Sequence, residues 1–424
     1  MDPVRLVGTY RRETLLRSRS TSTRASFALI LRASGYRTFT ANSSSASLDS
    51  RTPPRSPLLR AHSSTMCRSP LHPLLAALPK CEHHLHIEGT LSPTLLFTLS
   101  ARNSISLPST PAYASPSALL TAYNGFTSLD SFLSYYYAGM SVLIHASDFE
   151  QLAWEYLVKA HSDGVVHAEI SFDPQAHTTR GVPYSTMVSG FTSACRRAEK
   201  ELGMSTLLIL CLIRHLPVAD SAQMFSEALS NNDFANGTLA GLGLDSSEID
   251  RPPQLFKEVY ASAKNAGIRR TAHAGEEGPV EYIASAIHNL DVCRIDHGIS
   301  LVDSASLMAE VVEKKILVTL CPMSNLRLKC VREIKEVPVR QFLDSGVMFS
   351  INSDDPAYFG GYVLDNYCAV QEAFGLSVEE WRRIARTSVE GSWCGEERKK
   401  EILGKIDDVL GTKFTGTKQT IEVS

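Results

Sequence analysis

Eight short apolar runs alternate with longer helix-like stretches from residue 80 onward, and this alternation restricts the fold more than any other feature of the sequence. The runs cover residues 81–86, 165–172, 207–214, 239–245, 269–275, 293–297, 316–321 and 347–352. Intervening stretches such as 149–162, 254–266 and 304–313 carry apolar residues at the i, i+3, i+4 spacing of amphipathic helices. A strand–helix unit repeated eight times is typical of a (β/α)8 barrel, the TIM barrel. We therefore predict an α/β chain with one such barrel, a helical insert over 91–163 after the first strand, and C-terminal helices over 377–409.

Four of the eight runs end in residues that can bind metals or move protons. These are His84 and His86 after the first run, His273 and Glu276 after the fifth, Asp296 and His297 after the sixth, and Asp354 and Asp355 after the eighth. Barrel enzymes carry their chemistry at the C-terminal ends of the strands. We therefore expect these four strand ends to converge on one face of the barrel.

The histidine spacing predicts a metal site. His84 and His86 are two residues apart on a strand, so both imidazoles point to the same side. One such pair is a weak signal, but His273 and Asp354 at other strand ends add a third imidazole and a carboxylate. This donor set suits Zn²⁺ with a water in an open position, where the water pKa falls to about 7. We expect one zinc ion per chain.

Three further residues could take part in the chemistry without binding the metal. Glu276 lies three residues beyond His273, where a carboxyl group could protonate a substrate nitrogen while hydroxide attacks the adjacent carbon. The alternative for Glu276 is an ordinary loop acid near a helix start. His297 is either a base for the attacking water or a histidine paired with its neighbour. Asp355 follows Asp354 directly, so one of the two can bind metal while the other faces a ligand, unless Asp-Asp-Pro is only a turn.

Five motifs in this chain resemble those of the adenosine/adenine deaminase family of zinc amidohydrolase-like barrels. They are LPKCEHHLHIEGT at 78–90, TAHAGEEGP at 271–279, RIDHG at 294–298, CPMSN at 321–325 and SINSDDP at 350–356, in family order. The resemblance covers about residues 78–375. Within the family, HAEISFDPQAH at 167–177, LDSSE at 244–248 and YFGGY at 358–362 are most similar to fungal-type adenine deaminases.

The resemblance implies a role for each residue that matches a family motif. Zinc would be held by His84, His86, His273 and Asp354, with Glu276 as proton donor to N1 of the purine, His297 orienting and deprotonating the attacking water, and Asp355 bonded to N7. The implied reaction is zinc-dependent hydrolytic deamination of adenine to hypoxanthine and ammonia, a step of purine salvage, with hydroxide attacking C6. His83 points to the opposite side of the strand from His84, so we expect it to face a helix or the surface and not the metal.

Glu88 is the residue that favours adenine over adenosine. The family's adenosine deaminases typically have Asp at this place, where it receives a ribose hydroxyl. A glutamate reaches one methylene further and would fill the ribose site, so we predict that Glu88 contributes to substrate binding. Alternatives are deamination of adenosine or of an N6-substituted AMP, although only Arg180 and Arg214 lie near strand ends to meet a phosphate. A non-catalytic ligand-binding barrel is disfavoured because every expected site residue is present.

Residues 1–65 differ in composition from the rest of the chain. They contain 11 Arg, no Lys, 13 Ser and three acidic residues, a net charge of +8, whereas the whole chain carries −3. This composition is typical of an organelle transit peptide, of a translated leader upstream of a start at Met66, or of plain disorder. We predict two parts: this leader over 1–65 and a single deaminase barrel over 66–424.

Charge, hydropathy and cysteine usage limit the partners and the compartment. The net charge of −3 gives no basic field for nucleic acid, and the longest apolar run, 207–213, is too short to span a bilayer. Nine cysteines with no C-x-x-C pair favour a reducing compartment. We expect a monomer or homodimer that acts on a small-molecule purine without nucleic acid or membrane. We expect it in the cytoplasm or the nucleus, with organelle targeting by 1–65 left open.

Overall fold

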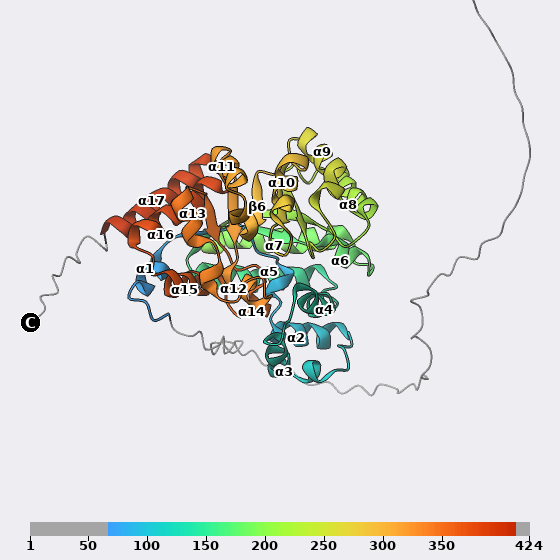
Figure 1. The fold of residues 1–424 in the computed structure, drawn as a ribbon. Coiled ribbons are helices and arrows are strands. Elements are labelled where there is room, and N and C mark those ends of the chain that lie inside the picture. Colours follow the sequence, from blue (N-terminus) through green and yellow to red (C-terminus); the bar gives the residue numbers. More distant parts are fainter. Residues whose placement is uncertain (1–66, 413–424) are drawn as a thin grey trace, which may run out of the picture. The chain divides into compact units, whose positions relative to one another are not determined.

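Residues 67–412, which the computed structural model describes, form a barrel of eight parallel strands surrounded by helices (Figure 1). The strands are β1 (Lys80–Glu82), β2 (Val165–Phe172), β3 (Ser205–Ile213), β4 (Gly241–Asp245), β5 (Arg269–Ala274), β6 (Arg294–His297), β7 (Leu317–Leu320) and β8 (Phe349–Ile351). Each strand pairs in parallel with the next one in chain order. A bridge between Leu85 and Asp354 joins the segments that follow β1 and β8, so the ring is nearly closed. The predicted (β/α)8 barrel is confirmed.

The helices cover the outside of the barrel and extend it at both chain ends. They are α1 (His72–Ala77), α2 (Pro93–Asn103), α3 (Pro116–Tyr123), α4 (Leu129–Met140), α5 (Ala146–Ser162), α6 (Pro174–Thr178), α7 (Tyr184–Leu202), α8 (Val218–Ser230), α9 (Lys257–Asn265), α10 (Val280–Asn289), α11 (Ala305–Glu313), α12 (Pro322–Arg327), α13 (Val339–Ser345), α14 (Pro356–Phe359), α15 (Val363–Phe374), α16 (Val378–Gly391) and α17 (Glu396–Thr412). Five 3-10 turns join them: η1 (Glu88–Thr90), η2 (Pro111–Ala114), η3 (Pro253–Phe256), η4 (Ile299–Asp303) and η5 (Ile334–Glu336). In α7, for example, Met187, Phe191, Ala194 and Ala198 are buried at helical spacing, and Gly203 ends the helix at a φ of 65°.

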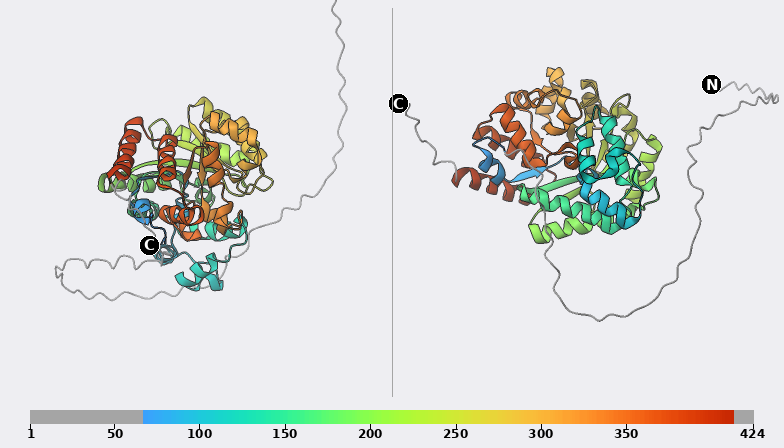
Figure 2. Two further views of the ribbon diagram at one scale, coloured as in Figure 1. Left: turned by 60° about the vertical axis from the view of Figure 1, so that its left-hand side comes forward. Right: turned by 90° about the horizontal axis from the view of Figure 1, so that it is seen from below.

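The predicted insert between β1 and β2 consists of α2, η2, α3, α4 and α5. Figure 2 shows α2, α3 and α4 together, in blue-green, beside the barrel. Helix α4 begins at a capping box in which Ser128 and Ser131 satisfy each other's backbone N–H groups. Phe132 and Tyr136 of α4 are buried and line the pocket where the strands end. The insert therefore supplies one wall of the site.

The first strand is shorter than predicted. Regular pairing stops at Glu82, and the chain rejoins the sheet only through bridges at Leu85 and His86. The cause is the side chain of Asn352, whose Oδ1 accepts the backbone N–H of His83 at 2.8 Å in place of a strand partner. His83 itself is buried, with Nδ1 3.0 Å from Oγ of Ser350 and Nε2 2.7 Å from Oγ of Ser392, next to the end of α16. It therefore faces a helix and not the surface.

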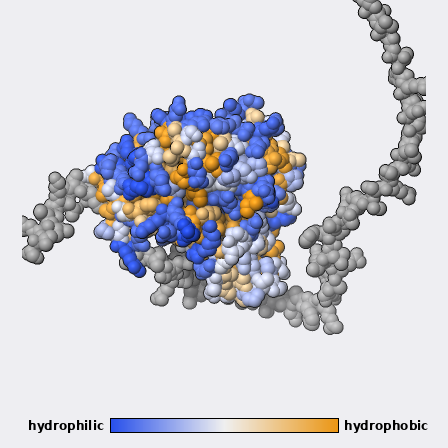
Figure 3. Space-filling model, viewed as in Figure 1, coloured by the Kyte–Doolittle hydropathy of each residue, from blue (hydrophilic) through white to orange (hydrophobic). Residues whose placement is uncertain are grey.

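The surface of the described residues is mostly polar. Figure 3 shows a largely hydrophilic face with small groups of apolar residues between the polar ones, which is ordinary for a folded domain. Within residues 67–412, no helix has the length and apolar character needed to cross a bilayer. The predicted leader over 1–65 lies outside the described residues.

Candidate active site

Four donor atoms from three strand ends meet at one point of the barrel mouth. Nε2 of His273 lies 3.2 Å from Nε2 of His84 and 3.1 Å from Nε2 of His86, and Oδ1 of Asp354 lies 3.2 and 3.5 Å from the same two nitrogens. Ligands about 2.0–2.2 Å from a tetrahedral ion lie roughly 3.3–3.6 Å apart, so these separations fit one ion. Acceptor lone pairs that face one another in a buried site repel unless a cation lies between them. The donor set therefore fits a metal ion.

Neighbouring side chains fix the orientation of these imidazoles. The hydroxyl of Thr319 donates to Asp296 at 3.0 Å and accepts Nδ1–H of His84 at 2.9 Å, which leaves Nε2 of His84 free for the ion. Nδ1 of His273 lies 3.5 Å from Asp296, and Nδ1 of His86 lies 3.5 Å from Asp245. Burial lowers the pKa of His86 to about 4, so the ring is neutral, which is the form that binds metals. Such outer partners orient and strengthen metal ligands.

Glu276 and His297 stand together beside the donor set. Nε2 of His297 lies 3.3 Å from Oε2 of Glu276 and 3.8 Å from Oδ2 of Asp354. The amide of Asn325 donates to Glu276 at 3.1 Å, and it lies 3.2 Å from Nδ1 of His297. Burial, together with the charges of Asp354 and Glu248, raises the pKa of Glu276 well above its usual value. The Glu276 carboxyl group is therefore suited to carry a proton at neutral pH.

A buried carboxylate fixes the loop that carries Glu276. Oε1 of Glu248 accepts the backbone N–H of Glu276 at 3.0 Å, and its Oε2 accepts those of Gly275 (3.0 Å) and Gly278 (3.1 Å). Gly275 has a φ of 78°, in the left-handed region where a side chain would be strained. Three hydrogen bonds to one carboxylate hold the strand-to-loop turn in a single conformation.

Of the nine non-glycine residues with positive φ within residues 67–412, three lie at strand ends of the site. His297 (φ 65°), Asp354 (φ 64°) and Ser246 (φ 73°) all adopt left-handed conformations without being glycine. Each costs on the order of 1–3 kcal/mol and persists only where surrounding contacts impose it. The surrounding fold therefore imposes these backbone conformations on the site.

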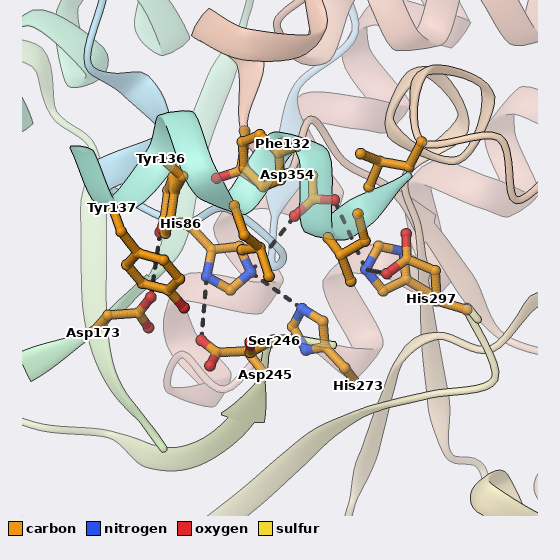
Figure 4. A pocket seen from close by; sticks show the side chains of 15 residues that line it. His86, Phe132, Tyr136, Tyr137, Asp173, Asp245, Ser246, His273, His297 and Asp354 are labelled. Atoms are coloured by element: carbon orange, nitrogen blue, oxygen red, sulfur yellow. Dashed lines mark hydrogen bonds and ion pairs between the residues drawn. The ribbon is translucent and has the colours of Figure 1, made fainter. Parts of the chain in front are cut away.

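The pocket in front of the donor set is shown in Figure 4. One side is formed by His297 and Glu276, and the other by Asp173 and Asp245, with aromatic and leucine side chains of α4 over them. Asp355 is buried in the wall, and its Oδ1 accepts no hydrogen bond within the described residues. Gly89 allows this placement, because a Cβ there would lie 1.9 Å from Oδ1 of Asp355.

Glu88 is not among the residues that line the pocket, and neither is His84. Glu88 is fully buried behind the wall, where Oε1 accepts Nε2–H of His177 at 2.9 Å and the backbone N–H of Asp173 at 3.1 Å. This differs from the expectation that its carboxylate occupies the sugar space directly. The buried imidazole of His177 draws the side chain toward α6 and away from the mouth.

A family model for adenosine deaminases matches residues 79–409. The chain belongs to the adenosine deaminase family. Adenine deaminase from Aspergillus oryzae is 60% identical over 343 residues, which cover 81% of this chain and 97% of that protein. Adenine deaminase from Schizosaccharomyces pombe is 56% identical over 342 residues, covering 80% of this chain and 93% of that protein.

Solved structures of family relatives have the same fold. An adenine deaminase from Arthrobacter aurescens matches with a TM-score of 0.75 at 41% identity, covering 79% of this chain and 99% of that one. An amidohydrolase from Burkholderia ambifaria with bound zinc matches with a TM-score of 0.73 at 25% identity, covering 84% of this chain and 96% of that one. Deaminases of this family are metal-dependent. In agreement, His84, His273, His297 and Asp354 bring possible ligand atoms within 4.8 Å of one another, and His86 does so with Asp173 and Asp245.

Several residues of the site in this adenosine deaminase family member were given no role of their own by the sequence. They are Asp173, Asp245, Glu248, Asp296, Thr319 and Asn325. All but Thr319 stand inside the motifs that carried the resemblance, so their positions were available in the sequence. What they contact was not, because their partners come from other strand ends.

Proposed function

We propose that this chain hydrolyses adenine to hypoxanthine and ammonia at the mouth of its barrel. The observation that carries the proposal is the Glu276–His297 pair, 3.3 Å apart, next to a donor set spaced for one ion. A proton donor and a basic imidazole on one side of a bound purine are what amine displacement at C6 requires. The relatives named above as adenine deaminases, at 56–60% identity, support the same reaction.

We propose zinc as the resident ion, held by His84, His86, His273 and Asp354. Imidazole and carboxylate donors suit zinc, and the related Burkholderia structure contains it. When bound, the ion would supply Lewis acidity that lowers the pKa of a water toward neutrality.

The chain's own residues divide the remaining work. The Glu276 carboxyl group gives its proton to N1 of the ring as water adds at C6. His297 holds the attacking water and takes its proton, which is later delivered to the departing ammonia. Asp355 bonds the N7 edge, and Phe132 and Tyr136 of α4 cover the ring and exclude solvent. Atoms balance as adenine plus water giving hypoxanthine plus ammonia.

Phosphorylated substrates are less well supported. Arg180 donates to the carbonyl of Ser141 at 3.3 Å and to His177 at 2.6 Å, and Arg214 donates to the carbonyls of Asp245 (3.2 Å) and Arg251 (3.1 Å). Neither guanidinium group lines the pocket. Among residues 67–412, the pocket lining therefore offers no free cation to the phosphate of an AMP derivative.

The test is a substrate panel on zinc-loaded full-length protein, measured by ammonia release from adenine, adenosine and AMP. We expect adenine to be preferred by at least ~10²-fold in kcat/KM. The variant Glu276→Gln should keep its zinc and its affinity for purines but lose at least ~10²-fold in kcat, because an amide cannot donate the proton. A wild-type protein that turns over adenosine within tenfold of adenine would contradict the proposal.

A further inference from the structure

Asp173 presents a buried carboxylate oxygen to the pocket without a donor to meet it. It follows β2, is 2% exposed and lines the pocket wall. Its Oδ2 lies 3.4 Å from the hydroxyl of Tyr136, whereas Oδ1 accepts no hydrogen bond from any of the described residues. Buried acceptors are almost always paired, and an unpaired one costs free energy. A ligand that brings a hydrogen-bond donor to this point would remove that cost.

The neighbouring carboxylate has a different position. Oδ2 of Asp245 lies 3.5 Å from Nδ1 of His86, the ring nitrogen that is not the candidate metal-binding atom. Asp173 makes no such contact. Both oxygens of Asp245 also lack a hydrogen-bond partner among the described residues. The contact of Asp245 with His86 is therefore what leaves Asp173, of the two acids on this wall, as the one available to a substrate.

The order of strands around the barrel decides which edge of a purine reaches Asp173. With N1 at Glu276 after β5 and N7 at Asp355 after β8, the N3–N9 edge of the ring faces the ends of β2 to β4. Asp173 follows β2 and Asp245 ends β4. Figure 4 shows both on the side of the pocket away from His297.

We propose that the carboxylate of Asp173 accepts the N9–H of a free purine base and thereby selects bases over nucleosides. This inference rests on the proposed function and names the residue that sets its substrate class. A nucleoside carries carbon at N9, so it loses this hydrogen bond and places a sugar against a buried carboxylate. Sites built to bond a substrate N–H reject analogues that lack it far more strongly than apolar pockets reject a methylene.

Glu88 acts in this scheme as a positioning residue. Nη2 of Arg180 lies 2.6 Å from Nδ1 of His177, and a guanidinium group can only donate, so Nε2 of His177 carries the proton. That proton is donated to Oε1 of Glu88, which also accepts the backbone N–H of Asp173. The chain from Arg180 through His177 and Glu88 therefore fixes the turn that aims Asp173 into the pocket.

The experiment compares adenine with 9-methyladenine, which differs from it by replacement of the N9 hydrogen. Zinc-loaded wild type should prefer adenine by at least ~10²-fold in kcat/KM. In Asp173→Ala, kcat/KM for adenine should fall by about 10–100-fold, mainly because KM rises, while kcat/KM for 9-methyladenine should change less than threefold. Asp173→Asn, which keeps the shape and a neutral acceptor, should fall between them and carries the test if the alanine variant does not fold. The control is Asp233→Asn, a buried acid bonded to the hydroxyl of Tyr184 outside the pocket, which should leave both substrates unchanged.

The inference is overturned if, in both Asp173 variants, the ratio of kcat/KM for adenine to kcat/KM for 9-methyladenine stays within threefold of the wild-type ratio. Wild-type protein without activity on adenine would instead overturn the proposed function. The inference would then be tested by the ratio of the Kd values for the two bases, measured by calorimetry. For Glu88, the Gln variant should keep the ratio, because its amide oxygen still accepts both N–H groups, whereas Glu88→Ala should reduce it. Equal behaviour of these two variants would remove Glu88 from the scheme.

Discussion

Each of the three candidate histidine ligands is oriented by a contact of its Nδ1 atom. Nδ1 of His84 is hydrogen-bonded to the hydroxyl of Thr319, which in turn donates to Asp296. Nδ1 of His273 lies 3.5 Å from the same Asp296 carboxylate. The two histidines on different strands thus share one acidic partner. At the scale of single residues, the site therefore behaves as one connected network, and the loss of one member should affect the others.

Replacement of His84 should remove the metal and the activity together. In His84→Ala, one of four ligands is lost from a site that also needs an open position, so metal affinity should fall by at least ~10-fold. Zinc per chain, measured by elemental analysis after dialysis, and ammonia release from adenine give the two readouts. The control is His288→Ala, whose imidazole is exposed and bonded to Glu310. A His84→Ala protein with one zinc per chain and normal turnover would contradict the ligand assignment.

Glu248 should affect kcat without touching the substrate. In Glu248→Gln, one of the two acceptor oxygens is replaced by an amide that faces backbone N–H groups, so the loop of Glu276 shifts. Small misplacements of a reacting group can cost ~10²-fold, and we expect a drop of about 10–100-fold in kcat with zinc content and KM nearly unchanged. The matched control is Glu277→Gln, which changes the half-buried residue after Glu276. Its kcat should stay within threefold of the wild-type value. Equal losses in both variants would show that the effect is one of charge and not of loop position.

At the scale of elements, the N-terminal end of β1 contains an unusual buried amine. Nζ of Lys80 donates to the carbonyls of Leu75 (2.5 Å) and Leu78 (2.9 Å) and has no exposed surface. Burial lowers its pKa to about 7, although Asp163 and Cys368 raise it, and Lys159 lowers it further. A neutral amine keeps two N–H donors, which are enough for both carbonyls. The link between α1 and β1 therefore does not require the charge.

This amine predicts a pH dependence of stability. Between a folded pKa of about 7 and the usual unfolded value near 10.5, the unfolded chain binds one proton more than the folded chain, so the free energy of unfolding rises with pH. The gain is up to about 1.4 kcal/mol per pH unit and is lost as the pH falls through 7. The free energy of unfolding of wild type and Lys80→Met is measured with denaturant at pH 6.5 and 8.5. From the lower to the higher pH, the value for the wild type should rise relative to that for the variant. A constant difference would mean that Lys80 stays charged when folded.

At the scale of the whole molecule, every strand and every wall of the pocket comes from residues 80–355. The C-terminal helices complete the barrel: Trp381 of α16 is fully buried and bonds Gln371 of α15 at 2.6 Å. We propose that residues 1–65 are dispensable for the barrel. Protein that begins at Met66 should keep its kcat/KM for adenine, and its Tm should stay within about 2 °C of the full chain. A larger fall in Tm would show that the preceding segment packs on the barrel.

The sequence by itself determined the barrel and the meeting of its strand ends. Hydrophobic periodicity is local, and once eight strands run parallel in chain order, their C-terminal ends must share one face. His84, His86, His273 and Asp354 could therefore be placed together from spacing alone, although their roles came from the resemblance. Only the tertiary structure decided the contacts around them. Glu88 meets His177 across 89 residues and Asn325 meets Glu276 across 49, and such contacts depend on how separate loops fold onto one another. Glu88 thus lies behind the wall and Asp173 in it, because side-chain direction at a turn is set by long-range packing that no local pattern encodes.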